Sequence, residues 1–138
     1  MKKLYFAHPI NTYGTELEKE LLVKITDAFP DWEIENPNQE KYRLGYEAWV
    51  KEHGRGMEYF YRQVLPGCAG CIVLPFRDGM WGAGVFGEAR RFNECACPLW
   101  IITFDGNIKT AGIDPSLALS VKETVERIRD EEGRSKPF

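Results

Sequence analysis

Short apolar runs alternate along this chain with amphipathic segments of helical spacing, and this alternation constrains the fold more than any single motif. Apolar runs bounded by glycine or proline predict strands, whereas apolar residues at every third or fourth position predict helices. The predicted strands are 4–8, 32–35, 71–74 and 99–104. The predicted helices are 15–28, 39–53, 57–65, 85–94 and 117–131. Such alternation is typical of a parallel sheet with helices on both faces.

The fold class follows from this order of elements. We expect residues 1–138 to form a single flavodoxin-like domain, a three-layer α/β/α fold whose mainly parallel sheet has the strand order 2-1-3-4. A length of 138 residues suits one domain. Asp105-Gly106 is a tight-turn signal, which predicts a short fifth strand at 107–109.

The sequence also predicts how the first helix begins and how the chain continues after the last helix. Thr15 with Glu18 three residues later resembles a capping box at the start of the first helix. At the other end of the chain, residues 133–138 follow the last helical pattern, and we expect them to form a loose tail.

The predicted strand order also places a binding site. The order reverses between the first and third strands, and ligands of such sheets bind outside the carboxyl ends of the strands at that point. The loops at this edge are residues 8–14 and 76–84, which are also the two most unusual segments of the sequence. We therefore expect the functional site between these loops.

The second of these loops is rich in glycine and leads into the helix that carries Glu88. Glycines let the backbone approach a ligand closely, and the helix start offers N–H groups to an oxygen-rich ligand. Residues 82–87 spell G-x-G-x-x-G, but they follow the third strand rather than the first, which disfavours a dinucleotide fold. A carboxylate beside such a loop is a catalytic candidate. The alternative is that Glu88 is a solvated helix residue.

Three segments resemble the nucleoside 2-deoxyribosyltransferases and the related deoxynucleotide N-hydrolases. They are the first strand and its loop at 5–10, the third strand at 68–74, and the glycine-containing run from Asp78 to Glu88 and Ala89. The resemblance implies an enzyme that cleaves or transfers at the N-glycosidic bond of a (deoxy)nucleoside or nucleotide through a carboxylate nucleophile.

The same resemblance implies roles for individual residues. Glu88 attacks the anomeric carbon of the sugar, and Tyr5 hydrogen-bonds and orients Glu88. Asp78 is a second carboxylate, for the sugar hydroxyls or for protonating the leaving base. The expected substrate-binding residues are His8, Pro9, Ile10, Asn11, Glu58, Gly79, Trp81, Gly82 and Gly84.

Two other functions remain open on the same fold. One is a non-catalytic nucleotide-binding or sensing module, since fold does not determine function. The other is an electron-transfer flavoprotein, which is disfavoured because the first loop is not the hydroxyl-rich phosphate loop that such proteins favour. A substrate that carries a phosphate needs an anion site, for which the N–H groups of residues 11–15 are a candidate.

Composition limits the partners. A net charge of −3 and a pI of about 5.5 disfavour a nucleic-acid polymer. No apolar run approaches the roughly 20 residues that span a bilayer, so we expect no membrane partner. No secretory signal is recognisable, which predicts a cytoplasmic protein. The expected chemistry needs no cofactor.

The cysteines and the aromatic residues raise two further hypotheses. Cys68 and Cys71, and Cys95 and Cys97, precede two neighbouring strands, a pairing that zinc sites use. Free thiols are the favoured interpretation for a cytosolic chain, so we expect no metal. The aromatic-rich segment 42–61 predicts an interface. Because the resembled family completes its active sites with a neighbouring subunit, we expect a homo-oligomer, with ordinary core packing as the alternative.

Overall fold

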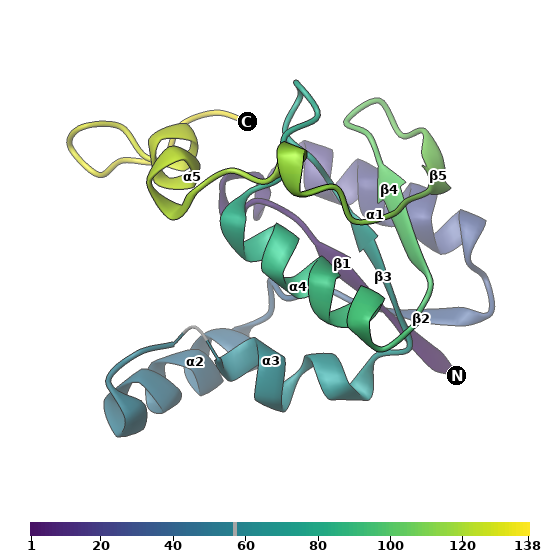
Figure 1. Cartoon of the computed structure of the whole chain (residues 1–138), viewed down its shortest axis with the longest axis horizontal. Coiled ribbons are helices and arrows are strands. Elements are labelled where there is room, and N and C mark those ends of the chain that lie inside the picture. The colour runs from purple at the N-terminus through teal and green to yellow at the C-terminus, as the bar shows by residue number, and fades with distance from the viewer. Residues whose placement is uncertain (57) are drawn as a thin grey trace.

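The computed structural model describes residues 1–56 and 58–138, and within them five strands form one sheet in the order β2-β1-β3-β4-β5 (Figure 1). The strands are β1 (Lys2–Ala7), β2 (Trp32–Glu35), β3 (Gly70–Val73), β4 (Leu99–Ile102) and β5 (Ile108–Thr110). β1 to β4 are parallel, and β5 runs antiparallel to β4. The predicted fold class and strand order are therefore confirmed, including the short return strand.

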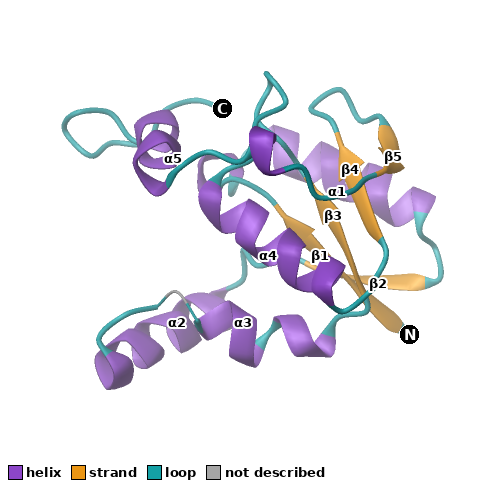
Figure 2. Cartoon of the chain, in the orientation of Figure 1, coloured by secondary structure: helices purple, strands orange, loops and turns teal. Residues whose placement is uncertain are grey.

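The helices lie on both faces of the sheet (Figure 2). They are α1 (Glu16–Ala28), α2 (Glu40–His53), α3 (Tyr59–Gln63), α4 (Ala83–Glu94) and α5 (Val121–Ile128). The predicted start of the α3 segment at Met57 lies outside the described residues. Short 3-10 turns occur at Ile10–Thr12, Leu65–Gly67 and Pro115–Leu117.

Alternation along the central strands divides the core into two layers. Successive side chains of a strand point to opposite faces. Tyr5 and Ala7 of β1 pack with α4 residues such as Ala89, whereas Leu4 and Phe6 pack with the α1 side. The orientation of Tyr5 toward α4 is thus a direct consequence of its position in β1.

Two parts of the chain extend from this body (Figure 1). α2 has no buried residue and packs on α3 through aromatic contacts such as Trp49 with Tyr59, whose ring centroids are 6.1 Å apart. α5 begins at a capping box between Ser120 and Glu123 and lies beside the start of α4. α5 begins four residues later than the predicted helix 117–131, because that box fixes its first turn, and it ends three residues earlier, at Ile128.

The predicted capping box of α1 is only half formed. The Thr15 hydroxyl accepts the Glu18 N–H at 3.3 Å. The Glu18 carboxylate does not return to the Thr15 N–H, however, and accepts instead from the Gly14 N–H at 3.1 Å and from His8 at 2.8 Å. His8 and the Gly14 N–H of the loop after β1 therefore occupy the carboxylate that a full capping box would have used.

The tail is docked rather than loose, which corrects the expectation for residues 133–138. The Lys136 carbonyl accepts from the Asn11 side chain at 3.1 Å, and the Phe138 carbonyl accepts from Arg77 at 3.2 Å. The rings of Phe138 and Phe76 stack with their centroids 6.0 Å apart. The tail therefore fastens the loops after β1 and β3 to α5.

The thiols do not form a metal cluster. Cys71 is buried in β3 and Cys95 is exposed, and all four cysteines are free. Among the described residues, no three His, Cys, Asp or Glu side chains gather in a way that could hold a metal ion. Within the same residues, no helix has both the length and the apolar character that crossing a bilayer requires.

Candidate active site

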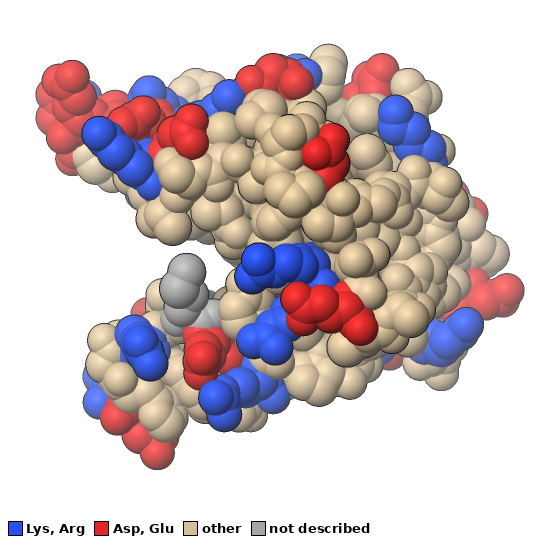
Figure 3. All heavy atoms as spheres, viewed as in Figure 1, with Lys and Arg blue, Asp and Glu red and all other residues tan. Residues whose placement is uncertain are grey.

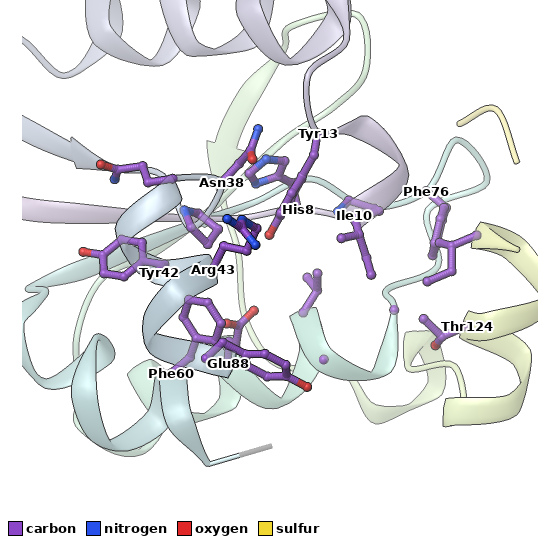
Figure 4. Close-up of a pocket in the computed structure, with 18 residues that line it drawn as sticks. His8, Ile10, Tyr13, Asn38, Tyr42, Arg43, Phe60, Phe76, Glu88 and Thr124 are labelled. Atoms are coloured by element: carbon purple, nitrogen blue, oxygen red, sulfur yellow. The ribbon is translucent and has the colours of Figure 1, made fainter. Parts of the chain in front are cut away.

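A cavity of about 600 Å³ opens at the carboxyl ends of the parallel strands (Figure 4). Its walls come from the loops after β1, β2 and β3, from the first two turns of α4, and from side chains of α2, α3 and α5. Most of the lining is apolar or aromatic, as in small-molecule sites generally. The aromatic lining residues are Tyr13, Tyr42, Tyr46, Phe60 and Phe76.

The central polar contact of the cavity joins β1 to α4. The Tyr5 hydroxyl donates to Glu88 Oε2 at 2.5 Å. Tyr5 is 1% exposed, and its ring stacks on Phe92 with the centroids 6.1 Å apart. Glu88 lies one turn after Val85, so its carboxylate faces the cavity while Tyr5 holds it from below. The contact that the resemblance implied between these two residues is present.

Burial brings the pKa of the Glu88 carboxyl close to neutral pH. Burial raises the pKa of Glu88 to about 7, although the hydrogen bond from Tyr5 opposes the rise. Burial and the adjacent Glu88 charge raise the pKa of Tyr5 well above its usual value, so Tyr5 remains a donor. A carboxyl with a pKa near neutrality in a cavity is typical of functional sites.

A second buried network fixes the loop after β1. His8 Nδ1 lies 2.8 Å from the Phe6 carbonyl, and His8 Nε2 lies 2.8 Å from Glu18 Oε2. Because a carbonyl only accepts, Nδ1 carries the hydrogen of the contact with Phe6. Asn38 adds a hydrogen bond to Glu18 at 3.0 Å.

This network is structural in character. Burial alone would raise the pKa of Glu18, but its hydrogen bonds outweigh burial and the pKa lies below the usual range. The His8 side chain is 0% exposed, so both ring nitrogens are committed to the protein. His8 therefore borders the cavity without offering a free ring nitrogen to a ligand.

Asp78 lies elsewhere. Its carboxylate accepts two bonds from the Arg127 guanidinium, at 2.9 and 2.7 Å. These bonds hold the pKa of Asp78 below its usual value. Asp78 borders a second, shallower hollow of about 350 Å³ together with Asn11, rather than the cavity that contains Glu88. The structure therefore does not bring Asp78 and Glu88 together.

The remaining predicted binding residues divide between the cavity and other places. Those that line the cavity with His8 are Pro9, Ile10, Gly82 and Gly84. Trp81 is 2% exposed within the core and does not offer a stacking face. Glu58 pairs with Arg62 on the surface at 2.9 Å, and Gly79 forms a turn with φ of 88°.

The anion-binding hypothesis for residues 11–15 is not supported by the geometry. The N–H groups of residues 12 to 15 all donate within the protein. The start of α4 is different, because the N–H groups of Gly84 and Val85 have no partner among the described residues and both residues border the cavity. The neighbouring Ala83 N–H donates to Thr124 Oγ1 at 2.9 Å.

Several lining residues were not predicted. Asn38 follows the end of β2 at the same edge of the sheet, so the strand order already contained a signal for it. Tyr13 lies in the predicted loop, but its sequence context does not distinguish it. Arg43, Phe60 and Thr124 come from helices whose packing no local pattern reveals.

The arrangement is suited to nucleophilic chemistry. It holds one carboxylate against a fixed phenol, at the wall of a cavity that is large enough for a nucleoside-sized ligand. Comparisons with protein-family models, curated proteins and solved structures find no match to this chain.

Proposed function

We propose that this protein is an enzyme that cleaves or transfers at the N-glycosidic bond of a (deoxy)nucleoside or nucleotide, with Glu88 as the nucleophile. The observation that carries the proposal is the 2.5 Å contact between the Tyr5 hydroxyl and Glu88 Oε2 at the wall of the cavity. The resemblance of segments 5–10, 68–74 and 78–89 to the deoxyribosyltransferases and N-hydrolases supports the same chemistry.

The proposed reaction has two steps. A Glu88 carboxylate oxygen bonds to C1′ of the sugar while the C1′–N bond breaks, and the bond electrons leave with the base. A carboxylate below the ring stabilises the oxocarbenium-like transition state before bonding to it. Water or a second base then attacks C1′ and releases Glu88, which gives hydrolysis or transfer.

The residues around Glu88 support this scheme in different ways. Tyr5 aims one oxygen of the carboxylate and leaves the other for the substrate. The aromatic walls offer faces on which a base can stack. The free N–H groups of Gly84 and Val85 suit the oxygen atoms of the sugar or of a substrate phosphate. Asp78 has no part in the scheme, because it is ion-paired outside the cavity.

The shape of the molecule supports a homo-oligomer as part of this proposal. Figure 3 shows an open notch between the lobe that carries α5 and the lobe formed by α2 and α3. Exposed apolar side chains lie on the helices of both lobes, including Leu44 and Tyr46 on α2 and Val121 and Val125 on α5. A second copy that covers these side chains would also close the cavity to water. Light scattering should give a mass above that of one chain, and Leu44→Glu with Val125→Glu should reduce it.

The alternative function is a nucleotide-binding or sensing module without catalysis. It predicts that nucleosides bind and are recovered unchanged. The hydrogen bond from the buried Tyr5 hydroxyl to Glu88 favours the enzyme, since a carboxyl that is fixed in a cavity and has a pKa raised by burial is typical of catalytic sites.

The test is incubation of the purified protein with deoxynucleosides and their 5′-monophosphates, with and without a second free base, followed by chromatography. We expect base release that Glu88→Ala abolishes, and the effect of the added base distinguishes transfer from hydrolysis. Asp78→Ala is the matched control, because it removes a carboxylate from the same loop region outside the cavity. Binding without release in the folded wild type would favour the module.

A further inference from the structure

Tyr13 presents a hydroxyl group to the cavity from the wall that faces Glu88. Figure 4 shows its side chain extending from the loop after β1, with the hydroxyl directed into the cavity toward the side on which Glu88 lies. The hydroxyl has no hydrogen-bond partner within residues 1–56 and 58–138. It is therefore available to a ligand.

The position of Tyr13 is fixed by the buried network beneath it. Its N–H donates to the Ile10 carbonyl at 3.1 Å, which ends the 3-10 turn. Its ring lies 4.8 Å from the His8 ring, which in turn stacks on Phe6 at 4.0 Å. Because Glu18 and Phe6 hold both nitrogens of His8, the aromatic surface beside Tyr13 does not rotate. Such preorganisation is what a transition-state contact requires.

Other side-chain donors around the cavity are already engaged. The Asn38 amide donates to Glu18, the Thr124 hydroxyl donates to the Ser120 carbonyl at 2.8 Å, and the Tyr42 hydroxyl donates to Glu35.

The Gln39 amide donates to Glu35 and to the Asn36 carbonyl. The last two side-chain donors of the lining, Arg43 and Tyr46, come from α2 rather than from the loop after β1. The Arg43 guanidinium donates to Glu40 and to Glu47 of the same helix. The Tyr46 hydroxyl packs over Gly56, where a Cβ atom would lie 2.5 Å from it. Tyr13 is therefore the side-chain donor best placed to act on a ligand.

Tyr13 also keeps its proton. Burial, followed by the negative charges of Glu88 and Glu18, raises the pKa of Tyr13 well above its usual value. It therefore remains a hydrogen-bond donor at neutral and moderately alkaline pH, where Glu88 ionises. The same property makes it a poor source of a transferred proton.

The proposed function, on which this inference rests, gives that donor a specific place. When a carboxylate attacks C1′ from one face of the sugar, the base departs from the opposite face. We propose that Tyr13 is a further catalytic residue, which donates a hydrogen bond to the departing base from the wall opposite Glu88 and so determines which bases can leave.

The bonding changes balance without proton transfer from Tyr13. The C1′–O bond to Glu88 forms and the C1′–N bond breaks, with its electron pair passing to the base. The Tyr13 O–H stabilises the charge that develops on a nitrogen or carbonyl oxygen of the base. The released base anion takes its proton from water. A base that departs as a neutral molecule needs no such help.

This difference defines the experiment. Base release by the wild type, Tyr13→Phe and Tyr59→Phe is measured with 2′-deoxyguanosine, whose base leaves as an anion, and with 7-methyl-2′-deoxyguanosine, whose base leaves neutral. If the wild type accepts only pyrimidines, 2′-deoxyuridine and its 5-nitro derivative replace them. Substrates carry the 5′-phosphate if the wild type requires it. Tyr59→Phe is the matched control, since it also loses a phenol hydroxyl, from a buried ring that does not line the cavity.

We expect Tyr13→Phe to lower kcat for the poorer leaving group about 100-fold, the usual effect of losing one transition-state donor. With the better leaving group it should lower kcat less than about threefold, and Tyr59→Phe should change kcat with neither substrate. Equal losses with both substrates, or no loss with either, would overturn the role of Tyr13 and leave the proposed function intact. No release by the folded wild type from any of these substrates would overturn the proposed function and the role of Tyr13 together.

Discussion

Two carboxylates at the two ends of one segment, Asp78 and Glu88, experience opposite environments. Glu88 is held by a phenol in an apolar cavity, and its pKa is raised to about 7. Asp78 is exposed and held by Arg127, and its pKa is lowered. The contrast shows that the surroundings of a carboxylate, rather than its residue type, decide whether it can take part in catalysis. Desolvation makes Glu88 chemically versatile, whereas the guanidinium makes Asp78 an anchor that joins the β3–α4 loop to α5.

The largest expected effect separates the two carboxylates by activity. Glu88→Gln should lower kcat for base release by at least about 1000-fold, because an amide cannot bond to C1′. Asp78→Asn should stay within about threefold of the wild type, since its carboxylate lies outside the cavity. Chromatographic assays of both variants under the same conditions check this. A loss of similar size in Asp78→Asn would show that Asp78 is as important for catalysis as Glu88.

A smaller effect concerns the partner of Glu88. Tyr5→Phe removes the hydrogen bond that lowers the pKa of Glu88, so that pKa should rise above about 7. The rate should fall about 10-fold to 100-fold at neutral pH and recover in part at higher pH. The measurement is kcat against pH for Tyr5→Phe and for Tyr59→Phe, whose profile should match the wild type because Tyr59 does not line the cavity. An unshifted profile in Tyr5→Phe would mean that Tyr5 does not set this pKa.

The wild-type pH profile follows from the same group. Glu88 acts as a nucleophile only when ionised, so kcat/KM should rise about tenfold per pH unit below pH 7 and level off above it. Measuring kcat/KM from pH 5 to pH 9 tests this. A rate that falls as the pH rises through 7 would indicate that Glu88 acts as an acid instead.

The two carboxylates also affect the free energy of unfolding in opposite directions. The folded state binds the Glu88 proton more tightly than the unfolded chain, so this group lowers stability as the pH rises from 4.5 through about 7. The shift corresponds to about 3 kcal/mol at most. Glu88→Gln should therefore raise the free energy of unfolding by about 1–3 kcal/mol at pH 8 and change it little at pH 4.5. Urea unfolding at the two pH values checks this, and a destabilised variant at pH 8 would contradict it.

The smallest effect belongs to Asp78. Its depressed pKa contributes stability that is present above the ordinary pKa of an aspartate and is lost as the pH falls through the folded value. The pair with Arg127 is exposed, which limits its contribution to about 0.2–1 kcal/mol. Asp78→Asn should lower the free energy of unfolding by that amount at pH 7, and the difference should vanish in acid. Thermal unfolding at both pH values provides the measurement.

These two carboxylates also show how far sequence reasoning extends. Tyr5 and Glu88 lie in elements with clear periodicity, and strand alternation with helical spacing turns both toward the same layer. Asp78 lies in a long loop without periodicity, and its partner is 49 residues away in α5. No local pattern encodes that contact, just as none encodes the position of Thr124 or the docking of Phe138 on Phe76.

The most direct test of the central claim is to trap the glycosyl-enzyme. A 2-deoxy-2-fluoroarabinosyl nucleoside carries a fluorine that destabilises the oxocarbenium-like transition states of both steps. Turnover is therefore slow, and the covalent intermediate is sought in the absence of an acceptor base. We expect intact-mass spectrometry to find one added sugar on the wild type and none on Glu88→Gln. Peptide mapping should place the sugar on Glu88. A sugar bound to another residue, or base release that Glu88→Gln leaves unchanged, would contradict the central claim.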